Sequence, residues 1–479
     1  MKYICKTCGY KYDENTKNKL FKDLNETFKC PLCGSSKEYF KEDNNKNIDN
    51  ENIKYKVIKN DNPCINRIYE KCINCGMCKK VCENITGIKD NTCIYCGNCI
   101  LNCPLSSLTP KYYYKSVEQA INDDEKIVIA LVAPAVRVSL GEAFDINGDV
   151  SKKIVTALKR LGFDYVFDAT LGADLTAVEE SQEILYRKEN NISLPMFTSC
   201  CPSFVKYIKT YHKDLIKNLS SCKSPIAMHS AILKYYFKNI KNIKNIKNIN
   251  KDNIVIVSIT PCTSKKYEAS IYNDTTYSIT ASELNIWLRE RGVNLKNIKN
   301  SKFDTIIKND LGNSSILFGN SKGVTASIIR CLYYNLKGKN TPKRIINYKP
   351  LKSFDKIKEI KITINKITFN MCCCYTISAF NELLKNDYYK KYDFIEVMAC
   401  VNGCVGGGGT ILCNNSKILK VNKTRANLIR KIDKRCPIKC AYQNEEIKYL
   451  YSNLLEYPNS LKAKEMLHTN HLEKVKSKL

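Results

Sequence analysis

Cysteine spacing constrains this chain more than any other feature. The chain has 26 cysteines in 479 residues. Eight of them form two runs with the same C-x2-C-x2-C-x3-C spacing: Cys72, Cys75, Cys78 and Cys82, then Cys93, Cys96, Cys99 and Cys103. Such short intervals in a long chain are typical of metal binding, whereas disulfide frameworks belong to small secreted proteins. We therefore expect these thiols to hold metal clusters.

Each run has the spacing found in bacterial ferredoxins with two [4Fe–4S] clusters, and Pro104 follows the second run as it does there. In that arrangement the fourth cysteine of each run binds the other cluster. The first cluster is therefore expected on Cys72, Cys75, Cys78 and Cys103, and the second on Cys93, Cys96, Cys99 and Cys82. We assign residues 61–110 to a ferredoxin-like α+β domain and give Cys64 no role.

Two more C-x2-C knuckles lie in the short polar segment 1–42, at Cys5 and Cys8 and at Cys30 and Cys33. Four thiolates suit one tetrahedral iron or zinc ion. The knuckles resemble those of rubredoxin, including the Tyr-Asp pair after the first knuckle and a Lys-x-x-Phe that ends at Phe40. We expect a small rubredoxin-like β-knuckle domain with one mononuclear iron, and zinc is the alternative. Residues 43–60, rich in Asn, Lys and Asp, read as a linker.

Residues 111–479 alternate apolar runs with helical patterns. Continuous apolar runs are typical of strands covered on both faces; they occur at Lys126–Pro134, Tyr165–Ala169, Asn253–Pro261 and Tyr392–Ala399. Helical patterns include Ser151–Leu161 and Thr176–Lys188. The alternation predicts a large α/β domain with mostly parallel sheets. The run 239–250 reads as a loop insertion or a lysine-rich helix extension.

Several cysteines of the large region follow directly on strands or strand-like segments: Cys200, Cys201, Cys262 and Cys400. In open α/β sheets, binding sites form beyond the carboxyl ends of the strands. Three separate segments would therefore deliver thiols to one crevice. A buried free cysteine is the alternative for each position alone, but the coincidence at three strand ends favours a shared site.

The formal net charge is +30, from 77 lysine and arginine residues against 47 acidic ones. Much of the lysine lies in Asn/Ile/Lys runs, and thiolates on iron would lower the charge. We therefore expect a solvated basic surface, or a docking face for an acidic electron carrier, and no nucleic-acid partner. No apolar run has the length of a membrane span, and the N-terminus lacks a signal-peptide pattern. These observations predict a cytoplasmic protein with no membrane association.

Three segments of the large region resemble the signature motifs of [FeFe]-hydrogenases. They are TSCCPSF (198–204), TPCTSKKYE (260–268) and EVMACVNGCVGGGG (396–409). Similarity continues through residues 132–144 and 161–180 and the C-terminal MLHTNH, so the resemblance covers nearly everything from residue 61 onward. It implies that residues 111–479 form a two-lobed catalytic domain that interconverts protons and electrons with H2, in an anaerobic setting.

The resemblance also implies the cofactor, an H-cluster in which a [4Fe–4S] cubane is bridged to a diiron unit with CO, cyanide and a dithiolate. By motif, the cubane ligands are Cys201, Cys262, Cys400 and Cys404, and Cys404 bridges to the diiron unit. Lys265 would donate a hydrogen bond to one cyanide, Pro134 and Ala135 would contact the other, and Met398 would pack beside the diiron unit. The implied partners are a redox protein such as ferredoxin or rubredoxin, and hydrogenase maturation proteins.

By the same resemblance, Cys200 passes protons to the cofactor. A thiol suits this task because its pKa is tunable and it both donates and accepts protons. Glu180, Glu183 and Arg187 lie at i, i+3 and i+7 on one face of an expected helix, and with Ser220 they match the family's proton path. The alternative for the three charged residues is a solvated helix face.

Departures from the family pattern surround the diiron position. In this chain Thr260 replaces the family's usual methionine, and Val401-Asn402 replaces a Pro-Gly-like pair. Thr410 replaces a glutamine and Phe204 a tryptophan. They suggest a divergent branch. Two other functions compete with hydrogenase activity: iron–sulfur cluster assembly, in relatives expected to lack the diiron unit and the relay cysteine, and hydrogen sensing through a partner domain. Cys200, Lys265 and Glu183 favour the enzyme.

Overall fold

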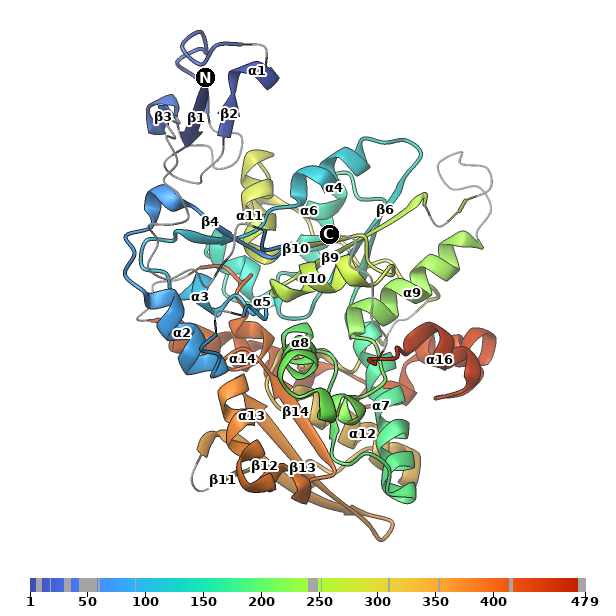
Figure 1. The fold of residues 1–479 in the computed structure, drawn as a ribbon. Coiled ribbons are helices and arrows are strands. Elements are labelled where there is room, and N and C mark those ends of the chain that lie inside the picture. Colours follow the sequence, from blue (N-terminus) through green and yellow to red (C-terminus); the bar gives the residue numbers. More distant parts are fainter. Residues whose placement is uncertain are drawn as a thin grey trace.

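The computed structural model describes most of the chain (Figure 1). The described residues are 1–5, 11–17, 19–29, 36–42, 58, 61–90, 92–239, 249–250, 252–308, 311–351, 354–412 and 417–472. Three of the four knuckle cysteines (Cys8, Cys30 and Cys33), Cys413, and most of the expected linker and of the run 239–250 lie outside these residues.

The first 42 residues contain a small antiparallel sheet in the order β2-β1-β3. Its strands are β1 (Lys2–Cys5), β2 (Lys11–Asp13) and β3 (Phe40–Glu42), joined by α1 (Glu14–Lys17) and the 3-10 helix η1 (Lys37–Tyr39). Aromatic rings fill its interior, where Phe21 contacts Tyr12, Phe28 and Phe40. Aromatic side chains bury large apolar areas, so such packing stabilises a sheet this small. The rubredoxin-like assignment stays a prediction.

Residues 61–110 form two similar halves. The strands β4 (Ile65–Arg67) and β5 (Leu108–Pro110) pair antiparallel, and each cysteine run leads into a helix, α2 (Met77–Thr86) or α3 (Asn98–Leu101). Gly76 and Gly97 precede these helices with the same φ of 73°. Glycine adopts this left-handed conformation without steric cost, so the repeated Cys-Gly sequence produces the same turn in both halves.

The first lobe of the large domain has a four-stranded parallel sheet in the order β10-β9-β6-β7. Its strands are β6 (Ile127–Val132), β7 (Tyr165–Asp168), β9 (Ile254–Thr260) and β10 (Tyr277–Thr280). Helices α4 (Tyr114–Ile121), α6 (Ser151–Arg160) and α11 (Ala281–Glu290) cover one face, and α7 (Thr170–Asn190) and α9 (Pro225–Lys238) cover the other. Both faces of β6 are buried, as its continuous apolar run predicts.

The second lobe has a five-stranded mixed sheet in the order β11-β12-β13-β14-β8. Its strands are β8 (Met196–Phe197), β11 (Lys349–Leu351), β12 (Phe354–Ile364), β13 (Ile367–Tyr375) and β14 (Phe394–Met398). The pairs β13·β14 and β14·β8 are parallel, whereas β11, β12 and β13 pair antiparallel. Helix α12 (Gly323–Lys337) packs on one face, and α8 (Pro202–Tyr211) and α13 (Ile377–Leu384) pack on the other.

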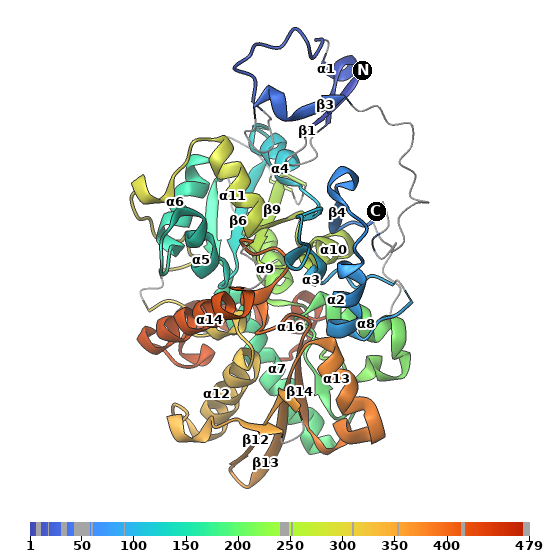
Figure 2. The ribbon, with the colours of Figure 1, turned by 90° about the vertical axis from the view of Figure 1, so that its left-hand side faces the viewer.

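Helix α7 joins the lobes. Its side chains belong to one hydrophobic core with strands of both sheets, and it is buried along most of its length. The remaining α-helices are α5 (Val136–Ser139), α10 (Ser264–Ile271), α14 (Ile418–Arg435), α15 (Glu445–Leu450) and α16 (Leu461–Leu467). Figure 2 shows α14 at a height between the two sheets, and Figure 1 shows α16 at the edge of the molecule, where it contacts α9. No helix of the described residues is both long and apolar enough to span a bilayer.

The expected strands of the large domain are confirmed, and their ends agree with the structure to within two residues. The expected helix 151–161 is α6, and the expected helix 176–188 is the C-terminal part of the longer α7. The prediction of a two-lobed α/β domain with mostly parallel sheets is confirmed, with an antiparallel part at β11–β13.

Two glycine-containing loops bring the ferredoxin-like region against the large domain. A Cβ atom on Gly408 would lie 2.5 Å from the carbonyl oxygen of Gly97 and 2.6 Å from its Cα. We expect Gly408→Ala to force these backbones apart and to cost about 1–3 kcal/mol of stability. Hydrogen exchange on the intact protein should show faster exchange of the amides of residues 92–103. Unchanged exchange there would mean that the two loops do not hold each other.

Candidate functional site

A cavity lies between the two lobes, and all four predicted cubane ligands line it. Cys201 follows β8 and precedes α8, Cys262 follows β9, Cys400 follows β14, and Cys404 begins the 3-10 helix η10 (Cys404–Gly406). β9 belongs to the first sheet, whereas β8 and β14 belong to the second. The cavity therefore takes its thiols from strand ends of both sheets, as the sequence predicts for a shared site.

These thiols have little contact with solvent: Cys400 is buried, and Cys201, Cys262 and Cys404 are partly buried. Burial raises the pKa of Cys201, and it raises the pKa values of Cys400 and Cys404 well above the usual range, with the other cysteines of the set adding to the effect. Buried thiolates need a cationic partner, and iron–sulfur clusters are bound by such thiolates. The set of four fits a [4Fe–4S] cluster; that it binds one stays a proposal.

The rest of the cavity wall supplies one cation and closely packed backbone. Pro134, Ala135, Met398 and Lys265 all line it. Lys265 Nζ bonds Glu268 Oε2 at 2.6 Å and lies 3.5 Å from the carbonyl oxygen of Cys200. Glu268 therefore holds the lysine at the wall. We did not single out Glu268 from the sequence, although its i+3 spacing from Lys265 carried that signal.

Two departures from the family pattern have a structural account. Thr260 also lines the cavity, and its hydroxyl bonds the backbone N–H and carbonyl of Cys262 at 3.3 and 3.1 Å, which fixes the turn that presents that thiol. Asn402 has a φ of 69°. Asparagine tolerates this left-handed conformation better than other non-glycine residues do, so it can follow Val401 where the family has a Pro-Gly-like pair.

Glu183 is the centre of a buried polar network on α7. Arg187 Nη2 bonds Glu183 Oε1 at 2.7 Å, Ser220 Oγ donates to Glu183 Oε2 at 2.9 Å, and the Ser221 N–H lies 3.1 Å from both oxygens. Burial alone would raise the pKa of Glu183, but the Arg187 charge and the Ser221 N–H hold that pKa below its usual range. The alternative of a solvated helix face is wrong, because these groups are buried.

Glu180 lies one turn earlier on α7 in a different environment. It is fully buried, and neither carboxyl oxygen has a hydrogen-bond partner among the described residues. Burial and then the charge of Glu183 raise the pKa of Glu180 to about 8. Cys200 lines the cavity, and burial followed by the charge of Glu180 raises its pKa well above the usual range. Glu180 therefore lies near enough to both Cys200 and Glu183 for charge on one to affect the next.

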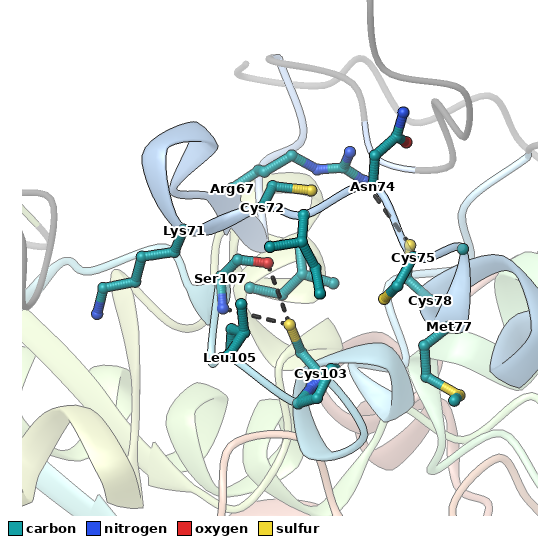
Figure 3. Close-up of a pocket in the computed structure, with 14 residues that line it drawn as sticks. Arg67, Lys71, Cys72, Asn74, Cys75, Met77, Cys78, Cys103, Leu105 and Ser107 are labelled. Carbon is teal, nitrogen blue, oxygen red and sulfur yellow. Dashed lines mark hydrogen bonds between the residues drawn. The ribbon is translucent and has the colours of Figure 1, made fainter.

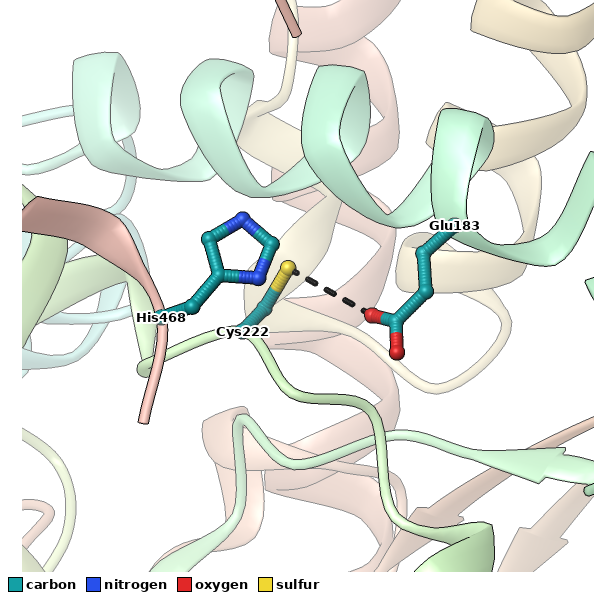
Figure 4. Close-up of side chains that lie close together, drawn as sticks. All are labelled: Glu183, Cys222 and His468. Carbon is teal, nitrogen blue, oxygen red and sulfur yellow. Dashed lines mark hydrogen bonds between the residues drawn. The ribbon is translucent and has the colours of Figure 1, made fainter. Parts of the chain in front are cut away.

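The network continues past Glu183 through residues to which we had assigned no role. Cys222 Sγ lies 3.9 Å from Glu183 Oε2, and His468 lies on the other side of Cys222 (Figure 4). His468 Nδ1 is 2.8 Å from Ser221 Oγ, and its Nε2 is 3.1 Å from Glu179 Oε2. Both imidazole nitrogens therefore have protein partners. The quoted MLHTNH segment contains His468, but its spacing alone gave no sign of this contact.

The four predicted ligands of the first ferredoxin cluster line a second cavity (Figure 3): Cys72, Cys75, Cys78 and Cys103. Cys103 comes from the second cysteine run, as the expected exchange of fourth ligands requires. Ser107 Oγ and N–H lie 3.1 and 3.2 Å from Cys103 Sγ, and Arg67 Nη2 lies 3.9 Å from Cys78 Sγ. Donors of this kind stabilise charge on cluster sulfurs.

The second predicted cluster lies between the first one and the large cavity. Burial, and then the charges of Cys96, Cys93 and Cys82, raise the pKa of Cys99 well above the usual range, so these four thiols share one buried space. Cys400 Sγ lies 4.0 Å from the carbonyl oxygen of Cys96, and Asn98 Nδ2 donates to the Ala399 carbonyl at 3.2 Å. The three cysteine sets thus form a line from the protein surface to the cavity.

Most cysteines without an expected role are buried in the core: Cys64, Cys222, Cys331, Cys372, Cys373, Cys374 and Cys440. Cys436 is partly exposed. For the rubredoxin-like site, the structure describes only the backbone of Cys5, at the end of β1, so the mononuclear metal stays a prediction.

Known proteins share this architecture. Residues 126–408 match the family described as iron only hydrogenase large subunit, C-terminal domain, and residues 419–474 match the iron hydrogenase small subunit. A solved structure of a variant of [FeFe]-hydrogenase HydA1 from Chlamydomonas reinhardtii superposes with a TM-score of 0.66 at 29% identity, covering 75% of this chain and 98% of that one.

Among curated proteins, the chain is 32% identical to iron hydrogenase 1 of Clostridium pasteurianum, over 83% of this chain and 74% of that protein. It is also 27% identical to the cytosolic Fe-S cluster assembly factor narfl of Xenopus tropicalis, over 81% of this chain and 85% of that protein. Fold and cavity thus define the class of two-lobed proteins to which [FeFe]-hydrogenases belong. The chain is a member of the iron-only hydrogenase family, as its motifs predict.

The environment of Glu180 predicts its protonation state, which can be tested. With its pKa raised to about 8, the carboxyl group is protonated at neutral pH and ionises as the pH rises through that value. Infrared spectra at neutral pH should contain a protonated-carboxyl C=O band that disappears above the pKa and is absent from Glu180→Gln. Glu396→Gln, which removes another buried carboxyl group, should leave this band in place. If wild type and Glu180→Gln gave the same spectrum, Glu180 would be ionised at neutral pH.

Proposed function

We propose that the protein is an [FeFe]-hydrogenase that reversibly reduces protons to H2. One observation supports the proposal most. Cys200, a thiol outside the ligand set, lines the four-cysteine cavity, and the acids Glu180 and Glu183 are buried next to it. A cluster scaffold needs the four ligands only. A proton-transfer chain ending at the cavity is needed only by an enzyme that consumes or releases protons there.

The cavity residues suit the H-cluster of the family. Cys201, Cys262, Cys400 and Cys404 would hold the cubane, with Cys404 bridging to the diiron unit, while Lys265, Pro134, Ala135 and Met398 would surround that unit. When bound, the H-cluster supplies the metal site at which electrons and protons combine. Lys265 is held at the wall by Glu268, so its ammonium group is in place to donate to a bound anionic ligand.

Proton delivery is the task of the α7 network. Glu183, kept ionised by Arg187, accepts a proton from the solvent side, and the Ser220 hydroxyl lies against it. Glu180, neutral at physiological pH, can donate to Cys200 and be reprotonated from Glu183. Adjacent acids whose pKa values are pushed apart by burial and charge suit such directed transfer.

The clusters held by the three cysteine sets would deliver the electrons. The two [4Fe–4S] clusters expected on residues 61–110 would pass single electrons toward Cys400, and the rubredoxin-like site would extend the relay. Ferredoxin or rubredoxin is the proposed partner class, and hydrogenase maturation proteins would supply the diiron unit. A cytoplasmic location remains part of the proposal; one relative is named a periplasmic [Fe] hydrogenase large subunit, from Nitratidesulfovibrio vulgaris.

The competing function is iron–sulfur cluster assembly, because relatives with that name match most of the chain. Infrared spectroscopy separates the two functions. The protein produced together with hydrogenase maturation proteins should show bands of metal-bound CO and cyanide and should evolve H2 from reduced methyl viologen. Protein with all its iron–sulfur clusters but neither the bands nor the activity would be a scaffold.

Metal content provides a second prediction. The motifs require about 15 irons per chain: one in the rubredoxin-like site, eight in the ferredoxin-like clusters and six in the H-cluster. Production without the maturation proteins should leave about two fewer and no activity, because only the diiron unit depends on them. Elemental analysis that finds one zinc in place of one iron would overturn the rubredoxin-like assignment and leave the other sites standing.

Cys200 provides a third prediction. Cys200→Ala should keep the CO and cyanide bands and lose most H2 evolution, about 100-fold or more, because a general acid is removed without touching a ligand. Cys200→Ser should also be poor, since a hydroxyl is a far weaker acid than a thiol. Cys200→Asp should recover part of the rate, and Glu183→Gln should behave like Cys200→Ala. Near-normal turnover in Cys200→Ala would refute the relay, and loss of the cubane would make Cys200 a ligand.

A further inference from the structure

Three side chains of the types that bind metal ions meet outside the three cysteine sets. Glu183 comes from α7, Cys222 precedes α9 and His468 follows α16, and all three are buried. One ligand atom of each lies within 4.8 Å of the other two (Figure 4). A thiolate, an imidazole nitrogen and a carboxylate oxygen are the usual side-chain ligands of zinc. We call these three residues the Glu-Cys-His cluster.

His468 has the second partner that metal-binding histidines usually have. Its Nε2 lies 3.1 Å from Glu179 Oε2, and the Asn459 N–H donates to the same oxygen at 2.7 Å. A ligating histidine commonly donates its other ring N–H to a carboxylate, which fixes the tautomer. A proton on Nε2 leaves the lone pair on Nδ1, where Ser221 Oγ lies at 2.8 Å. A metal ion would replace this hydroxyl contact.

The two carboxyl oxygens of Glu183 have different neighbours. Arg187 Nη2 donates to Oε1 at 2.7 Å, whereas Oε2 faces Cys222 Sγ at 3.9 Å. Ser220 Oγ donates to Oε2 at 2.9 Å, and ligating carboxylates are commonly hydrogen-bonded in this way. Oε2 can therefore bind a cation while the ion pair at Oε1 stays in place.

Charge in this buried space also favours a divalent cation. Burial, and then the charges of Glu183 and two neighbouring acids, raise the pKa of Cys222 well above its usual range. A bound cation reverses that effect, because metal binding displaces the thiol proton. The Cys222 thiolate and the carboxylates of Glu179 and Glu183 would then balance the charges of the ion and Arg187.

We propose that Glu183, Cys222 and His468 bind one zinc ion, and that the ion stops proton transfer. This inference rests on the proposed hydrogenase function and adds an inhibitor of its proton path. Binding breaks the S–H bond of Cys222, forms a Zn–S bond and releases one proton to solvent, with no change of oxidation state. Glu183 Oε2 bound to zinc cannot accept a proton, so Glu180 and Cys200 lose their supply from the solvent side.

Zinc can reach the cluster through a third cavity. Cys222 lines this cavity, and so does Leu472, which is 70% exposed. The cavity is also lined by lysines, which repel a free cation: Lys206, Lys209, Lys213 and Lys223. Inhibition should therefore develop slowly after zinc is added, and it should develop faster at high KCl, where charge is screened.

Zinc binding and H2 evolution, both measured on the fully assembled enzyme, test the proposal. Equilibrium dialysis against ZnCl2 should load one more zinc per chain in wild type than in Cys222→Ala or His468→Gln. Zinc-edge X-ray absorption of this extra ion should show one Zn–S distance of about 2.3 Å and nitrogen or oxygen at about 2.0 Å, unlike a four-sulfur site. H2 evolution from reduced methyl viologen should fall about 100-fold with zinc and return with EDTA, because a proton-transfer group is blocked. MgCl2 should have no effect, since magnesium prefers oxygen ligands.

Each variant is compared with its own zinc-free rate, which Cys222→Ala and His468→Gln should keep when zinc is added. Cys440→Ala, which removes another buried cysteine, should bind the extra zinc and be inhibited like wild type. Equal zinc content in wild type and both cluster variants would overturn the site, and extra zinc without loss of turnover would overturn the inhibition. Absence of H2 evolution from the zinc-free wild type would instead overturn the proposed function, and dialysis would still decide the zinc site.

Discussion

Convergence of four thiols between two sheets is the constraint on which the rest of the structure depends. Cys262 comes from the end of a strand in one sheet, and Cys201 and Cys400 follow strands of the other. These ends can meet only if the two lobes face each other across one cavity, and α7 holds them in that position by packing against both sheets. Gly408 then lets the ferredoxin-like loop approach at Gly97 from outside the cavity.

Burial sets the chemistry of the groups around that cavity. The same helix carries two carboxyl groups with opposite behaviour, because Glu183 has Arg187 and two serines as partners while Glu180 has none of comparable charge. Desolvation favours the neutral form unless a partner offsets it. A neutral acid next to an ionised one is the arrangement that proton transfer needs, and a solvated helix face would not provide it.

The sequence predicted much of the fold, and the failures have physical causes. The buried strands were recognisable because parallel strands covered on both faces are continuously apolar. The start of α7 was missed because residues 170–178 are buried nearly all round, which removes the 3.6-residue contrast that marks a helix. His468 was not singled out, because its partner Glu179 is brought close only by folding. Glu268 was overlooked although it lies one helical turn from its partner Lys265.

The amino-acid sequence by itself determined the types of ligand, their grouping by spacing and the family, because metal–thiolate chemistry requires cysteines at short, fixed intervals. Only the tertiary structure decided that Cys400 lies against the backbone of Cys96 and that Ser220 bonds Glu183. It also decided which carboxyl group is neutral. These properties depend on desolvation and on charges acting through space, and both are set by residues that lie far apart in the chain.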